Sequence, residues 1–419
     1  MLRKVGYGTK LVRDYNELNI LRFIKLYGPL SRAQLSKKYK ISKATVSEII
    51  TKLMEVNFVK EIGMGKSTKI GGRKPILLEF NPKAGFAIGI EIKRDHARVA
   101  LTDLNAHIYK QNTIEYPENV SLTDVLVLLF PLISDYLKET WVKSAKPMGI
   151  GVSIPGLIDY KKGCILESDS LKEWEGVLIK KIFEKEFGIE TFIENDVKAI
   201  TFGESRFGNG RNYNNMIYLW VGDGIGAGIV INGELYRGVS ASAGEVGFYE
   251  LGYYIQNEAE FKWLYNGHKT FGDILSEKVL IEGACKGIRE NFETGMKENE
   301  LSIETIMDKA LEDDPLALEL IKEYAGIVGI LCINLINTLN PEILLIGGDH
   351  LAYNTRLMEY IRERVKKDEL HTPILAVKIQ NAGLKDVSGV LGSVGLVLDD
   401  IFYSEQLNLG RYRAIFGKS

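Results

Sequence analysis

The feature that most constrains the fold of this chain is a glycine-rich stretch at 216–248. An apolar run at 216–221 is followed by a turn and by a second apolar run at 229–231. The glycines that alternate through this turn are Gly222, Gly224, Gly226 and Gly228. Strand, glycine turn and strand predict a β-hairpin whose backbone N–H groups can approach an anion, and a tight hairpin without a ligand is the alternative. Because a strand and not a helix follows the glycines, the stretch is not a dinucleotide-binding fingerprint.

The length and composition indicate a multidomain protein without membrane spans. With 419 residues, the chain is long enough for two to four domains. We expect no membrane partner, because no apolar run approaches the ~20 residues of a membrane span, and no signal peptide, because the basic N-terminus lacks an apolar core. The three cysteines, Cys164, Cys285 and Cys332, are widely separated and odd in number, which favours reduced thiols and a cytoplasmic location.

The charge is distributed unevenly along the chain. Residues 1–80 contain 17 Lys and Arg against 6 Asp and Glu, a net charge of +11, whereas the remainder contains 36 basic and 49 acidic residues. A basic N-terminal module on an acidic body suits a nucleic-acid partner. A solvated basic face without a partner is the alternative that charge alone leaves open.

The N-terminal module has the pattern of a winged helix-turn-helix. A helix at 14–27 ends at Gly28-Pro29, and Ser31 and Ser42 are the predicted N-caps of helices at 32–39 and 43–55. Strands at 58–62 and 75–80 enclose a Gly- and Lys-rich loop, the predicted wing, which can follow a narrow minor groove. Because motif and charge agree, we expect DNA binding; an ordinary hairpin is the alternative for the wing. The residues predicted to contact DNA are Ser31, Arg32, Ser42, Lys43, Thr45, Ser47, Thr51, Arg73 and Lys74.

The body of the chain, which begins after Asn81-Pro82, alternates strands and helices and is therefore placed in the α/β class. Strands are predicted at 86–92, 97–103, 148–153, 190–193, 342–346 and 375–379, and helices at 121–141, 176–187, 199–207, 273–291, 302–311, 315–339, 354–368 and 386–402. Asn195 and Asp196 follow a short strand, at the edge where open α/β sheets bind ligands. A helix N-cap is the alternative for this pair, because capping requires the same side chains.

Five motifs, in this order, resemble the ROK family (repressor, open reading frame, kinase) of sugar-responsive regulators and sugar kinases. They are Gly151–Gly156, Glu194-Asn195-Asp196, Gly222–Gly228, Ala243–Gly247, and Leu339–Glu342 leading to Gly347-Gly348. With the winged helix added, the chain is similar to the repressor branch, of the xylose-repressor type. The resemblance implies a two-lobed actin-like (ribonuclease H-like) ATPase-type fold with a sugar site in the cleft. The expected domains are 1–82 for the winged helix, 83–199 completed by 384–419 for the first lobe, and 200–383 for the second.

Departures from the family pattern argue against a kinase. The family's kinases hold ATP phosphates with an Asp-x-Gly-Gly-Thr loop, and this chain has Gly89-Ile90-Glu91-Ile92-Lys93-Arg94-Asp95 at that place. Side chains in place of glycines block the approach of the backbone to a phosphate, so we expect no enzyme activity and no cofactor. Asp196 matches the catalytic base of the kinases and would here only accept a hydrogen bond from a sugar hydroxyl. A sugar kinase, and a constitutive regulator that has lost its ligand, are the alternative functions.

The sugar and zinc positions also differ from the family. Phe248 stands where the family has a histidine, Ser170 where it has an asparagine, and 249–272 has no cysteine, so no structural metal is expected. The resemblance implies sugar contacts from Ser170, Asn195, Asp196 and Glu245, and Glu258 or Glu260 is an open candidate for a further carboxylate.

The function expected from the sequence is sugar-responsive repression of carbohydrate genes, with xylose or a related sugar as effector. Sugar in the cleft would favour one closure of the lobes and so reposition two winged helices on a pseudo-palindromic double-stranded operator. Such an operator requires a homodimer or a dimer of dimers, for which the apolar helix at 315–339 is a candidate interface element. The sequence leaves the identity of the sugar, the operator and the sign of the response open.

Overall fold

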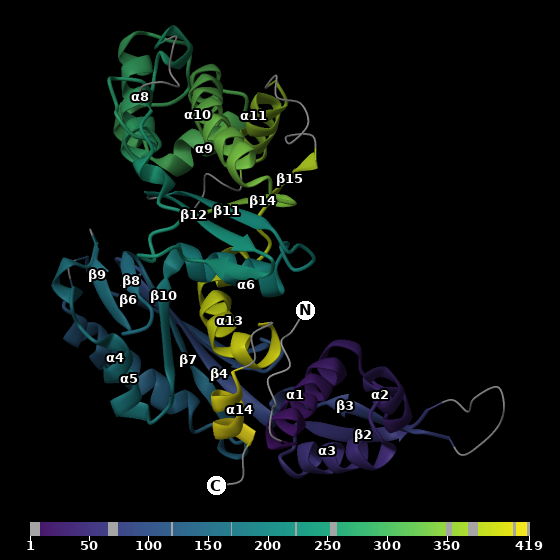
Figure 1. The fold of residues 1–419 in the computed structure, drawn as a ribbon. Coiled ribbons are helices and arrows are strands. Elements are labelled where there is room, and N and C mark those ends of the chain that lie inside the picture. Colours follow the sequence, from purple (N-terminus) through teal and green to yellow (C-terminus); the bar gives the residue numbers. More distant parts are fainter. Residues whose placement is uncertain are drawn as a thin grey trace.

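The computed structural model describes residues 9–65, 74–118, 120–168, 170–222, 224–251, 258–348, 354–367, 376–404 and 408–416. Figure 1 shows a small helical module at one side (purple), a lower lobe (blue) and an upper lobe (green), with the C-terminal helices (yellow) between the lobes and the module. A winged helix-turn-helix is thus followed by two α/β lobes, as predicted.

The N-terminal module is built from locally encoded elements. Its helices and strands are α1 (Thr9–Tyr27), β1 (Leu30–Ser31), α2 (Arg32–Tyr39), α3 (Lys43–Glu55), β2 (Val59–Met64) and β3 (Ile76–Phe80), with the strands in the order β1-β3-β2. The predicted caps are confirmed, because Ser31 Oγ accepts from Gln34 N and Ser42 Oγ accepts from Thr45 N. The apolar stripe of α3, which includes Val46 and Ile50, is buried in the module's core.

The first lobe contains a five-stranded sheet in the order β10-β7-β4-β5-β6. Its elements are β4 (Gly85–Ile92), β5 (His96–Asp103), β6 (Ile108–Glu115), α4 (Leu122–Tyr136), β7 (Lys146–Ile154), β8 (Leu157–Asp159), β9 (Cys164–Glu167), α5 (Ile179–Phe187) and β10 (Thr191–Asn195). Side chains alternate across this sheet, so Ile88 and Val152 share a core with α4 and α5 while the opposite face meets another helix. That helix is α13 (Ser388–Phe402), and it lies so close that a Cβ on Gly151 would be 2.0 Å from the carbonyl oxygen of Ser393.

Strands β6, β8 and β9 were not predicted from the sequence. Strand β6 is the edge of its sheet and is mostly exposed, so its residues lack the apolar alternation of a half-buried strand. Strands β8 and β9 are short and form a two-stranded sheet of their own. All three are strands because of their pairing partners, which local sequence does not reveal.

The second lobe contains the other five-stranded sheet, in the order β13-β12-β11-β14-β15. Its elements are β11 (Met216–Gly222), β12 (Gly224–Ile231), β13 (Glu234–Tyr236), α7 (Phe271–Ile274), α8 (Glu277–Arg289), α9 (Ile303–Leu311), α10 (Pro315–Leu339), β14 (Ile343–Gly347), α11 (Thr355–Lys366) and β15 (Lys378–Asn381). The predicted glycine hairpin is confirmed by the antiparallel pairing of β11 with β12. Most of the apolar side chains of α10 are buried within this lobe and form its core, and the role of α10 as a subunit-interface element stays a prediction.

Helix α6 (Asp196–Phe207) joins the lobes. It packs on β12 of the second lobe, where a Cβ on Gly228 would be 1.8 Å from Thr201 Oγ1, and on α13 of the first, where a Cβ on Gly203 would be 2.8 Å from Gly392 N. The predicted domain boundary between residues 199 and 200 therefore falls inside a continuous helix. The helix begins directly after β10, so the chain leaves the first sheet at residue 195.

The C-terminal helix α14 (Leu409–Phe416) was not predicted. It covers the N-terminal module, with the rings of Phe58 and Phe416 at a centroid distance of 4.5 Å and an ion pair of 2.7 Å between Arg413 and Asp14. The end of the chain therefore attaches the winged helix to the lobes as well as completing the first lobe.

Helix α1 also contacts the first lobe, through partly buried polar contacts. Arg22 donates to three carbonyl oxygens at the C-terminal end of α13, those of Ile401 (2.6 Å), Ser404 (2.8 Å) and Asp400 (3.0 Å). Such groups at the end of a helix lack partners within it, so a guanidinium there satisfies them. Nearby, Lys25 Nζ donates to the carbonyl oxygen of Leu104 at 3.0 Å, and burial lowers the pKa of Lys25 to about 8.

None of the helices in the described part of the chain combines the length and the apolar composition needed to cross a bilayer. The three cysteines are free thiols, as expected, and two of them are buried.

Candidate functional site

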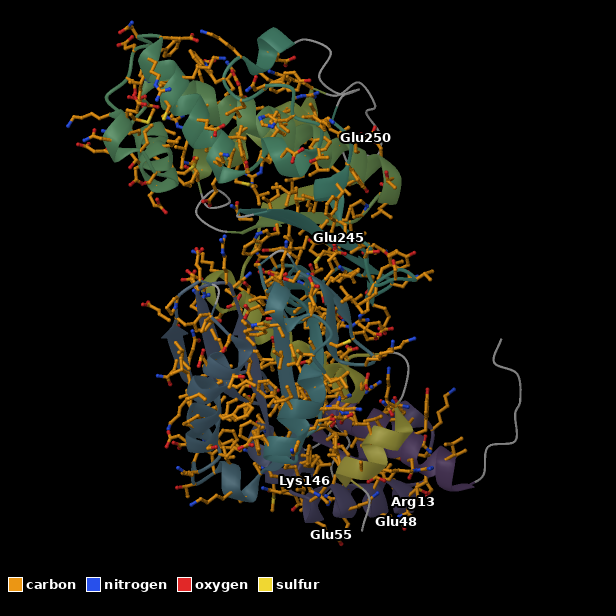
Figure 2. The ribbon with its side chains drawn as sticks, turned by 90° about the vertical axis from the view of Figure 1, so that its left-hand side faces the viewer. Arg13, Glu48, Glu55, Lys146, Glu245 and Glu250 are labelled. Carbon is orange, nitrogen blue, oxygen red and sulfur yellow. The ribbon has the colours of Figure 1, made fainter. Side chains whose placement is uncertain are left out.

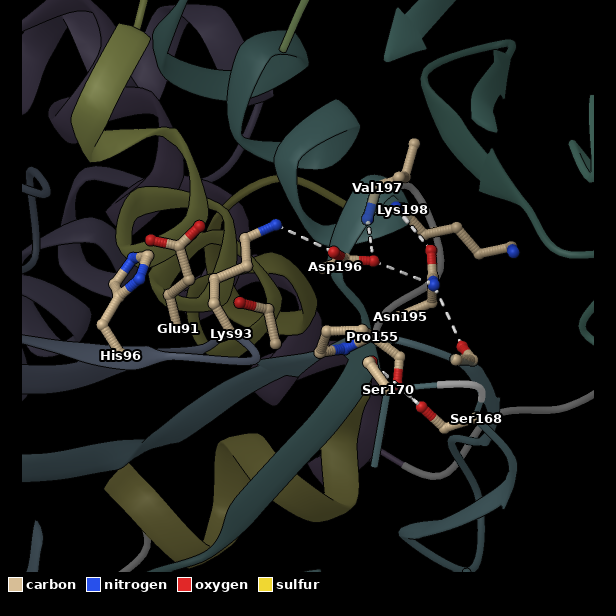
Figure 3. Close-up of polar contacts among 12 residues, drawn as sticks. Glu91, Lys93, His96, Pro155, Ser168, Ser170, Asn195, Asp196, Val197 and Lys198 are labelled. Carbon is tan, nitrogen blue, oxygen red and sulfur yellow. Dashed lines mark hydrogen bonds and ion pairs between the residues drawn. The ribbon is translucent and has the colours of Figure 1, made fainter. Parts of the chain in front are cut away.

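The predicted sugar-binding residues lie around the point where the two lobes meet. Asn195 and Asp196 are at the junction of β10 and α6, beside the ends of β4 and β7, and Figure 3 shows them in one view with Ser170 and Lys93. In Figure 2, Glu245 lies at the level where the lower and upper lobes meet, while Arg13 and Glu48 lie at the other end of the molecule in the winged helix.

Asn195 is both a helix cap and a link to the neighbouring turn. Its Oδ1 accepts from Lys198 N at 3.0 Å, so the capping interpretation is confirmed. Its Nδ2 donates to the carbonyl oxygen of Gly156 at 3.0 Å, which ties α6 to the turn after β7. Gly156 has φ +114, a conformation that favours glycine.

The Asp196 carboxylate is held from three sides. Its Oδ1 accepts from Val197 N at 2.9 Å and from Asn195 Nδ2 at 3.1 Å, and its Oδ2 pairs with Lys93 Nζ at 2.9 Å (Figure 3). The side chains of Lys93 and Asp196 are 19% and 13% exposed, so solvent screens this ion pair only weakly. Lys93 directly follows β4 and Asp196 directly follows β10 of the same sheet, so the pair joins two strand ends at the carboxyl edge of the first lobe.

The turn that presents Lys93 is rigid. Lys93 N donates to the carbonyl oxygen of His96 at 2.8 Å, closing the β4–β5 hairpin. The Tyr116 hydroxyl lies 2.9 Å from the carbonyl oxygen of Lys93 and 2.7 Å from that of His96, and burial raises the pKa of Tyr116. The Lys93 ammonium also lies 4.6 Å from the ring centroid of Trp220 on β11, within cation–π range.

Glu91 fills the remaining space beside this turn. Its carboxylate pairs with Arg98 at 3.2 Å, and a Cβ on Gly389, in the first turn of α13, would be 2.2 Å from it. The Glu91 and Lys93 side chains therefore fill the space beside the β4–β5 turn, and the expectation that they block the approach of a phosphate there stays a prediction.

Ser170 lies on the opposite side of the Pro155-Gly156 turn from Lys93 (Figure 3). Its Oγ is 3.4 Å from the Oγ of Ser168, which itself donates to the carbonyl oxygen of Pro155 at 3.1 Å. Ser168 was not predicted; it is buried and holds the loop that carries Ser170.

Glu245 is held by a buried cation that sequence reasoning did not identify. Lys198 is only 2% exposed, and its Nζ lies 3.4 Å from Glu245 Oε1. The preceding Gly244 has φ +91, and its carbonyl oxygen accepts from Ala227 N at 2.8 Å, which fixes Glu245 against the glycine hairpin. A second unpredicted pair joins Arg237 Nε to Glu194 Oε2 at 2.6 Å.

The segment after Glu245 contains Phe248, which replaces a family histidine, and the candidate carboxylates Glu258 and Glu260. Phe248 is 75% exposed. The side chain of Glu258 and all of residues 252–257, which belong to the predicted zinc-loop region, lie outside the described residues. Glu260 lines a surface pocket of the second lobe together with Trp263 and Phe292. Glu323 of α10 anchors the following backbone by accepting from Trp263 N at 2.9 Å, and burial raises the pKa of Glu323 to about 7.

The predicted DNA-contacting residues divide into two groups. Lys43, Ser47 and Thr51 are exposed on α3, and Lys74 is exposed at the base of the wing. Ser31 is buried and engaged in its capping box, Arg32 pairs with Glu61 of β2 at 2.8 Å, and the hydroxyls of Ser42 and Thr45 are 2.8 Å apart. Arg73 lies outside the described residues. Ser42 is exposed as well, so it is available to a duplex together with Lys43, Ser47, Thr51 and Lys74.

Comparisons with known proteins agree with this architecture. The ROK family profile matches residues 87–400, and a winged helix-turn-helix DNA-binding profile matches residues 13–60. The xylose repressor of Caldicellulosiruptor bescii is 30% identical over 395 residues, covering 93% of this chain and 97% of that protein. A crystal structure of a ROK family transcriptional regulator, described as a homologue of the Escherichia coli Mlc protein, superposes with a TM-score of 0.80 at 21% identity over 97% of this chain and all of that one.

A third relative is a kinase. The ROK family glucokinase of Streptomyces griseus, solved with glucose and AMPPNP, superposes with a TM-score of 0.59 at 20% identity over 74% of this chain and 99% of that one. At such identities the likeness shows the fold alone, and the predicted two-lobed actin-like fold is confirmed.

Proposed function

The chain belongs to the ROK family, and from that premise we propose that it is a sugar-responsive transcriptional repressor. The observation that carries the proposal is that one chain joins a capped helix-turn-helix, with its exposed Lys43, to two lobes at whose junction Lys93 pairs with Asp196. By analogy with the relatives named as xylose repressors, xylose or a related sugar is the proposed effector and carbohydrate genes are the proposed targets.

The proposed sugar contacts are Ser170, Asn195, Asp196 and Glu245, which the fold brings to the lobe junction. Carboxylate oxygens accept hydrogen bonds from sugar hydroxyls, and the side-chain amide of Asn195 can both donate to and accept from them. The protein is proposed to act without enzyme activity, because the β4–β5 turn offers side chains in place of a phosphate cradle. The kinase alternative keeps one point in its favour, since Asp196 stands where a kinase has its base. Its Oδ2, however, is engaged by Lys93.

The route from sugar to DNA is proposed to pass along α13. The first turn of this helix lies against Glu91 beside the cleft, and its last turn is held by Arg22 of the winged helix. A change in lobe closure that moves α13 would therefore move α1. A coupling of about 1–3 kcal/mol corresponds to a change of about 5–150-fold in operator affinity. A cytoplasmic homodimer or dimer of dimers on a pseudo-palindromic double-stranded operator completes the proposal.

Replacing Arg22 with methionine is expected to uncouple sugar binding from the change in operator affinity. The variant loses the hydrogen bonds to the end of α13, so the ratio of operator affinities without and with sugar should fall to below about twofold, from the ~5–150-fold typical of allosteric coupling. Sugar binding, measured as a thermal shift, should remain. Arg13→Met is the matched control, because Arg13 lies on the same helix in an exposed ion pair with Glu48. An unchanged ratio in the Arg22 variant would show that α13 does not carry the signal.

The proposed function itself is tested with a panel of sugars on the full chain. A sugar that binds only the folded state must raise the midpoint of thermal unfolding, by about 2.7 kcal/mol of stabilisation at a concentration 100 times its Kd. A sugar that does so should also change the affinity for operator DNA. If no sugar of the panel shifts the midpoint, the constitutive alternative holds, and transfer of phosphate from ATP to any of them would establish the kinase.

A further inference from the structure

The face of α3 that points away from the core of the winged helix carries small side chains. The buried stripe of this helix consists of Val46, Ile49, Ile50 and Leu53. Ala44, Ser47 and Thr51 recur every three or four residues on the opposite side, and all three are exposed. In a helix-turn-helix the N-terminal part of the second helix contacts base edges in the major groove, so these residues are the ones placed to meet them.

Longer side chains on the two flanks of α3 are directed toward neighbouring helices. On one flank Glu48 pairs with Arg13 of α1 at 2.8 Å (Figure 2), and Lys52 pairs at 2.8 Å with a buried carboxylate of α1. On the other flank the sulfur of Met54 accepts from Arg32 of α2 at 3.8 Å. The stripe of small residues therefore lies between the flanks that α1 and α2 hold.

The chemistry of this stripe is largely that of methyl groups. Thr51 Oγ1 donates to the carbonyl oxygen of Ser47 at 2.9 Å, so its proton is used within the helix. Hydroxyl and methyl diverge from the same Cβ, which leaves the Thr51 methyl to contact another molecule. Ala44 presents a methyl group alone. The Ser47 hydroxyl between them can donate or accept and therefore suits every base.

From this face we propose that α3 reads its operator half-site through the 5-methyl groups of thymine, which the methyl groups of Ala44 and Thr51 contact. The inference rests on the proposed function and adds the base chemistry of its DNA partner. Thymine alone among the four bases carries an apolar group in the major groove, and alanine and the threonine methyl are side chains that contact it. Ala44 and Thr51 are two helical turns apart, about 10 Å along the axis, which spans about three base pairs.

The wild-type test removes single methyl groups from the DNA. Half-sites are selected from a random duplex pool with the full chain, and each thymine is then replaced by uracil, which keeps the base pair and lacks the methyl. We expect two thymines, within about four base pairs of each other, at which this change weakens binding about fourfold. Selected half-sites in which no thymine is sensitive overturn the inference and leave sugar-controlled binding intact. Failure to select any sequence counts against the proposed function.

Variants assign the sensitive thymines to their side chains. Thr51→Ser keeps the hydroxyl and removes the methyl, so the preference for thymine over uracil should fall from about fourfold to about onefold at one position, whereas Thr51→Val should keep it. Ala44→Gly should remove the preference at the other position, and any loss of helix stability cancels because both duplexes meet the same protein. Thr338→Ser is the control, since Thr338 is an exposed threonine of α10 whose hydroxyl also donates four residues back, at 2.7 Å. A Thr51→Ser protein that keeps the full preference at every thymine would show that this methyl does not read the base.

Discussion

Replacing Asp196 with alanine is expected to weaken the sugar response of the protein strongly while leaving operator affinity unchanged. A hydrogen bond to a charged group contributes about 1.5–3 kcal/mol, so the effector concentration needed for half-release should rise by about 10–150-fold. The loss should be larger than that of a surface contact, because the carboxylate is only 13% exposed and is oriented by Val197 N, Asn195 and Lys93 before any ligand arrives. The measurement is operator release against sugar concentration, with operator affinity determined in the absence of sugar.

The control for this variant is Asp135→Ala, which removes an exposed carboxylate of the same lobe that lies 3.5 Å from Lys110. It should respond to sugar like the wild type. Circular dichroism and the unfolding midpoint of the Asp196 variant establish that it folds, since the substitution leaves Lys93 without this partner. A folded Asp196→Ala protein that still releases DNA at the wild-type sugar concentration would show that the sugar site lies elsewhere.

Replacing Arg73 and Lys74 together with alanine is expected to weaken operator binding about 30-fold at 0.15 M salt. Each phosphate contact contributes about −0.9 to the slope of log K against log salt, so the slope should become shallower by about 1.8. Lys74 is exposed shortly before β3, and the strands β2 and β3 are paired as far as Met64 and Ile76. The sugar-binding thermal shift should be unaffected.

The matched control removes the same charge from the far lobe, in Lys278→Ala/Lys297→Ala. Both side chains are highly exposed on the helical part of the second lobe and form only surface ion pairs. The control should leave the salt slope unchanged. A wing variant that weakens binding without changing the slope would place the loss in folding of the module, and an unchanged affinity would remove the wing from the DNA interface.

Much of the N-terminal module could be predicted because its signals are local. Ser31 and Ser42 cap the helices that follow within three residues, and the apolar spacing of α3 repeats every three or four residues. The glycine hairpin at 216–231 was predictable for the same reason, since its strands pair directly across a turn. Helix α10, whose bounds at 315 and 339 follow from Asp314-Pro315 and Asn340-Pro341, is a further example.

Features that depend on distant pairing were missed or misjudged. Strand β6 is polar and becomes a strand because β5 lies beside it, and α14 is held by aromatic contact with a module that begins some 400 residues earlier. The burial of α10 within its own lobe was not evident from its apolar composition, which suits a core and a subunit interface equally well.

By itself, the sequence determined the winged helix, the α/β body and the residue types at the cleft, because caps, periodicity and turn chemistry act over a few residues. Only the tertiary structure decided which of those residues face one another. Lys93 and Asp196 are 103 positions apart, Lys198 and Glu245 are 47 apart, and Arg22 meets α13 across more than 370 residues. These contacts form because α6 and α13 pack closely on each other and on the sheets, which brings together residues that are far apart in the chain.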